Sequence, residues 1–189
     1  MLDIALQFLT DELNTYLLTR TGSDTVKAKL TKLVEDTGKY GFEQGSIGIS
    51  VINIEEERTV KEHLPGYDYV NGRHVVKPPE LRLNLHVMFA ANLRLYEESL
   101  KYIAYILTFF QANPAFTPDG FPGLDARVEK LLLELQSLSY EQLNQIWAFV
   151  GGKQLPSVVY KVRMVVLAPD APSAIQLPIT QTGTVIRSR

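Results

Sequence analysis

The sequence predicts an α+β fold: a single domain in which a mixed or antiparallel sheet of about four to six strands packs against helices. From 81 to 89 every second residue is apolar, as in a strand with one buried face, and from 96 to 110 apolar residues recur at spacings of three and four, as in a helix. A chain of 189 residues that is 46% hydrophobic and 21% charged can build one such core. We expect the domain to span residues 1–168, followed by an extended C-terminal arm over 169–189.

The segment before this stretch is predicted to contain one helix and two strands. Leucines at helical spacing indicate an N-terminal helix that ends near Gly22. Residues 26–31 alternate apolar side chains with lysines, a pattern typical of an edge strand whose lysines face water. Residues 46–54 alternate β-branched residues with the small residues Gly48 and Ser50, and we expect these two to let another backbone approach that face.

A β-hairpin is predicted between residues 67 and 77. Two short segments of β-forming residues flank Asn71 and Gly72, the dipeptide that best fits a two-residue type I′ turn. The chain then returns through Pro78 and Pro79 to the alternating strand. Asn92 is predicted to cap the helix that follows this strand.

Two further helices and one strand are predicted after the central helix. Val128, Leu131, Leu132 and Leu135 recur at helical spacing, which predicts a helix over this segment. A capping-box pattern, Ser139 with Gln142, begins a shorter helix that ends at Gly151-Gly152. Residues 157–167 are apolar enough for a central strand, and the segment that follows is weakly structured by composition.

Few residues could carry chemistry. The absence of cysteine excludes a disulfide framework and a thiolate metal site, and the three histidines lack metal-ligand spacing. Glu55, Glu56 and Glu57 at a strand end could hold a divalent cation or supply a general base. Alternation sends adjacent carboxylates to opposite faces, which favours a solvated strand end. With no catalytic or phosphate-binding motif either, we expect no enzyme, no cofactor and no metal site.

Charge and hydropathy narrow the partners and the location. A net charge of -2 argues against a general nucleic-acid binder. The longest apolar run, YIAYILTFF, is about half of the roughly 20 residues that a membrane span needs. The N-terminus carries acids and lacks a basic segment, so we expect synthesis in the cytoplasm without a signal peptide, and no membrane span.

Three features indicate protein association instead. The central helix carries a second apolar stripe, which a partner subunit could cover. Basic residues fall on predicted strands and would form a basic patch if those strands share a face, although a solvated outer face explains them equally well. The hairpin and the arm offer further surface. The residues that we expect at protein interfaces are Tyr67, Tyr69, Asn71, Gly72, Tyr102, Ile106, Phe109, Lys161, Arg163, Ile175, Leu177 and Ile179.

Three stretches of the chain are similar to a known protein family. They are VINIEEERTVKE at 51–62, PPELRLNLHVMFAANLRLYEESLKYIAYILTFFQANPAFTP at 78–118, and LSYEQLNQIWAFVGGKQLPSVVYKVRMVVL at 138–167. They resemble the tail terminator, or cap, proteins of extracellular contractile injection systems, the phage-tail-like particles of the antifeeding-prophage and Photorhabdus virulence cassette type. Matching positions include Asn53 to Glu57, Pro78, Pro79, Asn84, Asn92, Phe109 to Gln111, Trp147, Pro156, Tyr160, Lys161 and Arg163.

The resemblance implies a tail-terminator-like fold and a structural role. A six-membered ring of identical subunits would close the end of the inner tube, contact the last sheath layer and fix the length of the particle. The implied partners are further copies of the chain, the inner tube protein, the sheath protein and, as a further candidate, a tape-measure or plug protein. Such a protein is made in the bacterial cytoplasm and becomes part of the particle. A monomeric adaptor that binds peptides by β-strand addition remains the alternative.

Overall fold

The computed structural model describes residues 1–57, 66–70, 73–77, 82–165 and 174–176. In this described part the helices are α1 (Leu2–Thr21), α2 (Tyr96–Ala112) and α3 (Tyr140–Val150). The strands are β1 (Ala28–Leu30), β2 (Ser46–Glu56), β3 (Gly66–Val70), β4 (Arg73–Lys77), β5 (Arg82–Asn92), β6 (Ala115–Phe116), β7 (Lys130–Gln136), β8 (Ser157–Val165) and β9 (Ala174–Gln176). The predicted α+β fold is confirmed.

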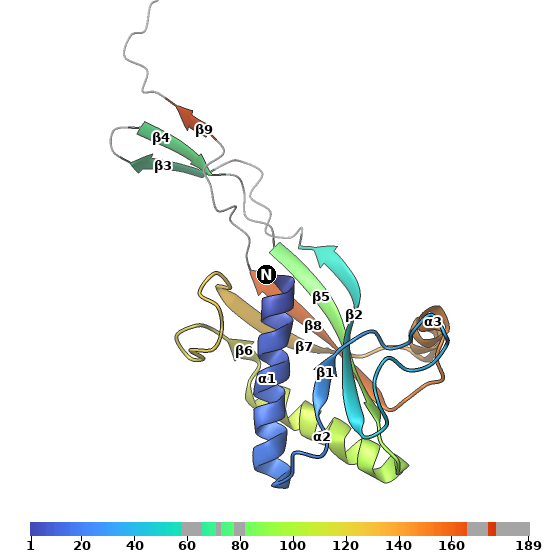
Figure 1. Ribbon diagram of the computed structural model, residues 1–189. Helices are drawn as coiled ribbons and strands as arrows, with labels where there is room; N and C mark the ends of the chain where they lie inside the picture. Colours follow the sequence, from blue (N-terminus) through green and yellow to red (C-terminus); the bar gives the residue numbers. More distant parts are fainter. Residues whose placement is uncertain (58–65, 71–72, 78–81, 166–173, 177–189) are drawn as a thin grey trace, which may run out of the picture.

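A mixed six-stranded sheet forms the centre of the domain, with the strand order β1-β2-β5-β8-β7-β6 (Figure 1). The pair β1 and β2 is parallel, and every other neighbouring pair is antiparallel. The long strands β2 and β5 pair from Ser46↔Asn92 to Glu56↔Leu83, with one register shift between Val51 and Asn53. As predicted, β1 lies at an edge of the sheet and β8 lies inside it, between β5 and β7.

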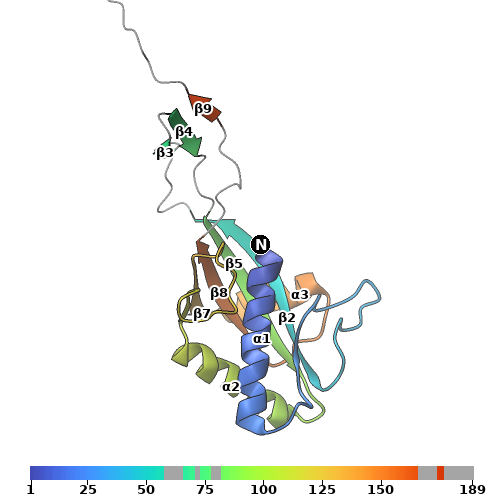
Figure 2. The ribbon, with the colours of Figure 1, turned by 60° about the vertical axis from the view of Figure 1, so that its left-hand side comes forward.

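Helices cover both faces of this sheet. Figures 1 and 2 show α1 and α2 on one face and α3 on the other. The side chains of α1 and α2 share one apolar core with the inward residues of β2, β5, β7 and β8. A smaller core on the opposite face joins Trp147 of α3 to Met88, Ala90 and Val159 of the sheet and to Phe42 of a loop. The alternation seen in the sequence therefore serves two apolar layers rather than one.

Aromatic rings fill the larger core. Phe110 of α2 packs on Tyr160 of β8 with ring centroids 4.8 Å apart, and Phe89 of β5 meets both rings, at 5.2 Å from Phe110 and 5.9 Å from Tyr160. Phe8 of α1 packs edge-on against Phe116 of β6 at 5.6 Å. These contacts join both helices to the strands on either side of the middle of the sheet.

A side chain of α1 closes the free edge of β1. Asn14 Oδ1 accepts a hydrogen bond from the backbone N of Ala28 at 2.8 Å, and Asn14 Nδ2 donates one to the backbone O of Ala28 at 2.9 Å. A neighbouring antiparallel strand would bind the same two backbone groups. The amide of Asn14 therefore replaces a further strand at this edge.

The prediction for the small residues of β2 needs one correction. Gly48 makes room for an aromatic ring and not for another backbone. A Cβ on Gly48 would lie 2.6 Å from Cε1 of Phe42. Phe42 reaches this place from the loop between β1 and β2, and its side chain is 6% exposed.

The helix predicted over 128–135 is wrong, because this segment forms β7. Leu131 and Leu133 are buried on the face covered by α1. Glu134 and Leu135, toward the end of the strand, are exposed. The spacing of Val128, Leu131 and Leu135 fits a helix, but the unpaired side of β8 supplies hydrogen-bond partners along the whole segment. Tertiary pairing thus overrides the helical preference of leucine.

The start of the central helix also differs from the prediction. Asn92 is the last residue of β5, where its backbone O accepts a hydrogen bond from Gly45 N at 2.7 Å. The helix begins at Tyr96 after Leu95, which makes no side-chain capping bond. The predicted capping box of α3 is confirmed, because Ser139 Oγ accepts from Gln142 N and Ser139 N donates to Gln142 Oε1.

A second sheet has three strands in the order β3-β4-β9. The strands β3 and β4 pair antiparallel from Gly66↔Lys77 to Val70↔Arg73, which confirms the two strands of the predicted hairpin. Residues 71 and 72 of the predicted turn lie outside the described residues. A segment expected to be weakly structured, Ala174–Gln176, forms β9 and pairs with β4.

Candidate interaction surfaces

The outer face of α2 is apolar, but it consists of other residues than expected. Ile106 is 0% exposed and Phe109 is 5% exposed, so both pack inside the domain. Tyr102 is partly buried, with its ring 5.7 Å from that of Tyr105. The solvent side of the helix start carries Leu95, Tyr96 and Leu100, which are 57%, 68% and 46% exposed. We call these three residues the α2 patch.

The sequence shows that α2 carries two apolar stripes, but it does not show which of them is exposed. Two apolar stripes run along this helix, and the hydrophobic period alone does not determine which one faces the sheet. The buried row includes Ser99, which is 3% exposed and whose Oγ accepts a hydrogen bond from Leu93 N at 3.3 Å. The buried side of the first turn therefore carries a serine, and the apolar residues Tyr96 and Leu100 face solvent.

Lys161 and Arg163 lie on β8, on the face of the large sheet that α3 covers only near Val159. Arg163 Nε lies 3.2 Å from Glu134 Oε1 of β7, with both side chains about half exposed. Lys161 stands opposite His86 of β5 and Glu134 of β7 in the strand register. Glu134 therefore lies beside both basic residues. This face carries mixed charge and does not form the basic patch that the sequence suggested.

Acidic residues at the end of β2 lie on the same face of the sheet. Glu57 Oε2 accepts a hydrogen bond of 3.0 Å from Asn84 Nδ2, and Glu55 Oε2 lies 3.2 Å from His86 Nε2. Asn84 is 3% exposed, so its amide fixes the position of Glu57 from inside the sheet. Among the described residues, no group of three or more His, Cys, Asp or Glu side chains is placed to hold a metal ion.

The remaining predicted interface residues belong to the second sheet. Tyr67 and Tyr69 lie on β3, where they stand opposite Val76 and His74 of β4. Ile175 lies on β9, opposite Val75 of β4. The structure thus brings the hairpin and the C-terminal segment together in one sheet. The predicted residues Asn71, Gly72, Leu177 and Ile179 lie outside the described residues.

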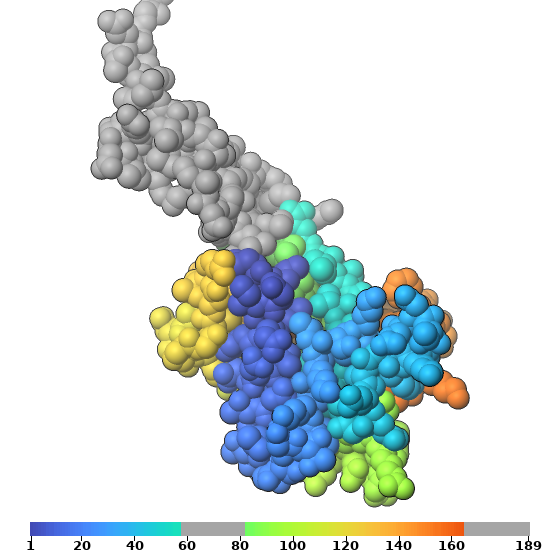
Figure 3. All heavy atoms as spheres, viewed as in Figure 1, coloured from blue at the N-terminus to red at the C-terminus, as the bar shows by residue number. Residues whose placement is uncertain are grey.

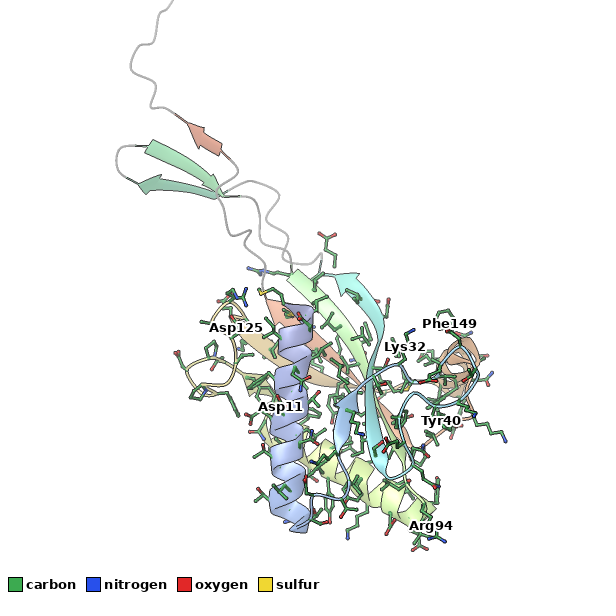
Figure 4. The ribbon with its side chains drawn as sticks, in the orientation of Figure 1. Asp11, Lys32, Tyr40, Arg94, Asp125 and Phe149 are labelled. Atoms are coloured by element: carbon green, nitrogen blue, oxygen red, sulfur yellow. The ribbon has the colours of Figure 1, made fainter. Side chains whose placement is uncertain are left out.

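A groove that the sequence did not reveal lies between α3, β2, β5 and the loop after β1. Its volume is about 660 Å³. Leu33, Ile52, Ile146 and Val159 contribute apolar surface to its walls, and Phe149 of α3, which is 89% exposed, stands at its rim. Figure 4 shows Lys32 and Phe149 on the same side of the domain. We call this cavity the α3 groove.

Two titratable groups depart from their ordinary behaviour. Hydrogen bonds from Arg127 lower the pKa of the partly exposed Asp125 to about 2. Arg127 holds both oxygens of this carboxylate, at 3.0 Å from Nε and 2.8 Å from Nη2. Burial raises the pKa of Tyr160 to about 12, because the phenolate would lose its hydration among the aromatic rings of the core. Both shifts have structural causes, and neither residue lines the α3 groove.

The architecture, a mixed six-stranded sheet with helices on both faces, is the fold of the tube terminators of contractile injection systems. The chain is similar to the PVC sheath/tube terminator of an extracellular contractile injection system in its extended state, with a TM-score of 0.68 and 13% identity over 100% of this chain and 64% of that chain. It is also similar to the tube-terminating cap of the anti-feeding prophage, with a TM-score of 0.60 and 12% identity over 94% of this chain and 60% of that chain.

The family model described as the Pvc16 N-terminal domain matches residues 5–181, and the chain belongs to this family. The resemblance to tail terminators that the sequence motifs indicate is thereby confirmed. The chain spans slightly less than two thirds of the length of both solved relatives. No curated protein matches it significantly. No helix within the described residues is long and apolar enough to cross a membrane.

Proposed function

We propose that this chain is a structural terminator of a contractile injection system, which ends the inner tube and holds the last layer of the sheath. The observation that carries the proposal is the match of the whole chain to the fold of a sheath/tube terminator, together with its membership of the Pvc16 N-terminal domain family. In this role the chain performs no catalytic step and works as part of an extracellular particle.

The terminator acts as a ring of identical subunits, with six copies as the expected number. Such a ring closes through head-to-tail contacts, in which two different surfaces of the chain meet. The α2 patch supports this arrangement, because three large apolar side chains at one helix start remain exposed on the single chain. A ring that is stable by itself should bury more than about 1,000 Å² in each contact.

The ring fixes particle length by occupying the end of the tube, so that no further tube ring can stack. One face of the ring binds the last ring of the inner tube protein, and the outer surface binds the sheath protein. A tape-measure or plug protein is a further candidate partner at the centre of the ring. The hairpin and the C-terminal segment, which share the sheet of β3, β4 and β9, are the proposed contacts with the sheath.

A monomeric adaptor that binds by strand addition is the second candidate function. One observation favours it: β3 and β9 are the outer strands of the small sheet in the described part of the chain. An extended segment of another protein could pair with either of them. The mass of the purified protein in solution distinguishes a ring-forming terminator from a monomeric adaptor only if the ring forms without the tube. The length and the ends of assembled particles distinguish them in either case.

The experiment deletes the gene from a strain that makes the particles and measures particle length by negative-stain electron microscopy. We expect a broader length distribution and ends on which tube and sheath separate, with normal particles after the gene is restored. Particles of unchanged length and unchanged ends in the deletion strain would contradict the terminator and favour the adaptor.

A further inference from the structure

We propose that the α3 groove binds an extended peptide segment of a partner protein, which inserts an apolar side chain and carries a carboxylate beside it. The inference rests on the proposed function for the origin of the partner, since a terminator binds other proteins of its particle. The kind of segment follows from the groove itself. Its volume of about 660 Å³ lies within the range of small-molecule pockets, about 300 to 1,000 Å³, which is room for one or two side chains of a segment.

The apolar part of the groove is formed by the sheet and α3. Ile52 of β2 and Val159 of β8 lie on the sheet side, and Ile146 of α3 lies opposite. Phe149 is 89% exposed at the rim, although it belongs to the helix that covers this face. An exposed aromatic ring next to an apolar hollow is typical of a surface that becomes buried on binding. The segment therefore needs at least one apolar anchor residue.

Neutral amides surround the apolar part. Asn53, Gln136, Gln142 and Gln145 all line the groove. Asn53 bonds to Glu55 and to Ile54 N, and Gln142 Oε1 accepts from Ser139 N, so both amides are engaged within the chain. Gln136 and Gln145 supply the amides that can meet a bound segment, because such a side chain carries both donors and an acceptor, as a peptide group does. Amides suit the main chain of an extended segment, because every peptide group of such a segment needs both kinds of partner when water is removed. This lining favours a polypeptide over a phosphorylated or strongly charged small molecule.

The charged residues of the groove favour a negatively charged group on the bound segment. Its lining includes Lys32 and His86 but no aspartate or glutamate. His86 has Glu55 beside it at 3.2 Å, whereas among the described residues no carboxylate lies within ion-pair distance of Lys32. Because Lys32 is exposed at one end of the groove, a carboxylate on the bound segment would pair with it at little desolvation cost.

The test uses the purified full chain and a phage-displayed library of random dodecapeptides. Enriched peptides are synthesised with a fluorescent label, and their binding is measured by fluorescence anisotropy. We expect the enriched sequences to share an apolar residue next to Asp or Glu. We also expect Lys32→Glu and Phe149→Ser each to weaken binding at least about tenfold, because the first reverses the charge that the carboxylate meets and the second removes the aromatic contact.

Two matched variants control for general effects. Lys39→Glu reverses another exposed lysine of the same loop, and Tyr140→Ser removes another exposed aromatic ring of α3, and neither residue lines the groove. Both should bind the peptides as the unchanged chain does, with melting temperatures showing that all four variants fold. Enriched peptides without an acid, peptides that bind all variants equally, or a selection that enriches no sequence would each overturn the inference.

The outcomes separate this inference from the proposed function. If the selection finds no groove-dependent peptide and gene deletion alters particle length, the groove does not bind peptides and the terminator function stands. Groove-dependent peptides combined with normal particles after deletion remove the terminator and leave a peptide-binding protein.

Discussion

The side-chain amide of Asn14 lies at the edge strand of the large sheet. Strand edges attract other strands, because their backbone groups lack partners. The side-chain amide of Asn14 binds both backbone groups of Ala28 and thereby closes the edge at β1. Strand addition is therefore blocked at this position of the β1 edge.

Replacing Asn14 by alanine should lower the free energy of unfolding by about 1 to 3 kcal/mol, because two backbone groups of a partly buried strand lose their partners. Urea denaturation measures the change. Asn144→Ala, at an exposed position of α3, is the matched control and should change stability by less than about 0.5 kcal/mol. An Asn14→Ala protein as stable as the control would show that the edge does not depend on this amide.

Tyr160 gives the domain a pH dependence at the alkaline end. Its pKa is raised from 10.0 to about 12 by burial, so the folded state disfavours the phenolate. The stability that this provides is complete below pH 10 and is lost as the pH rises from 10 through about 12. The unchanged protein should therefore lose more free energy of unfolding between pH 9 and 11 than Tyr160→Phe, as measured by urea denaturation. Equal losses would contradict the buried phenol.

At the scale of elements, the sequence predicts the features that depend on residues close together in the chain. The capping box of α3 was found because Ser139 and Gln142 bond to each other within one turn. The strand β7 was missed because its leucines fit both a helix and a strand, and the pairing with β8 decides between them. The side of α2 that faces the sheet depends on packing in the same way.

The α3 groove could not be predicted from the sequence for a related reason. Its walls come from the loop after β1, from β2, β5 and β8, and from α3, and no short motif joins these segments. Exposed Phe149 was the available signal, but a phenylalanine at a helical position next to Trp147 is indistinguishable in sequence from a core residue.

Contact between elements also makes Gly48 a test of the smaller core. Gly48→Ala places a Cβ about 2.6 Å from the ring of Phe42, and we expect a loss of about 1 to 3 kcal/mol in the free energy of unfolding. In a double-mutant cycle with Phe42→Leu, the double variant should be more stable than the sum of the two single losses predicts. Additive losses would mean that the ring and Gly48 are not in contact in solution.

At the scale of the whole molecule, the space-filling view in Figure 3 shows α1, the loop between β1 and β2, and the N-terminal part of α2 on one face of the domain. Large exposed apolar residues occur on α1, β1, β2 and β7 as well as on α3, and three of them lie together at the start of α2. A monomer gains nothing from such exposure, whereas a ring of copies would bury it.

The α2 patch can be tested by the mass of the assembled protein. Leu100→Glu should shift the mass measured by light scattering from the ring toward the single chain, because a buried carboxylate opposes the contact. Leu18→Glu on α1 is the matched control, since Leu18 is 47% exposed and Leu100 is 46% exposed. If both variants keep the mass of the unchanged protein, the α2 patch is not part of the contact between copies.

Electron cryo-microscopy of intact extended particles would show whether this chain sits at the end of a contractile particle, as we propose. We expect a closed ring of this domain at the end opposite the baseplate, in contact with the last tube ring and the last sheath layer. Particles whose capped ends contain another protein, or which carry this chain anywhere but at that end, would contradict it.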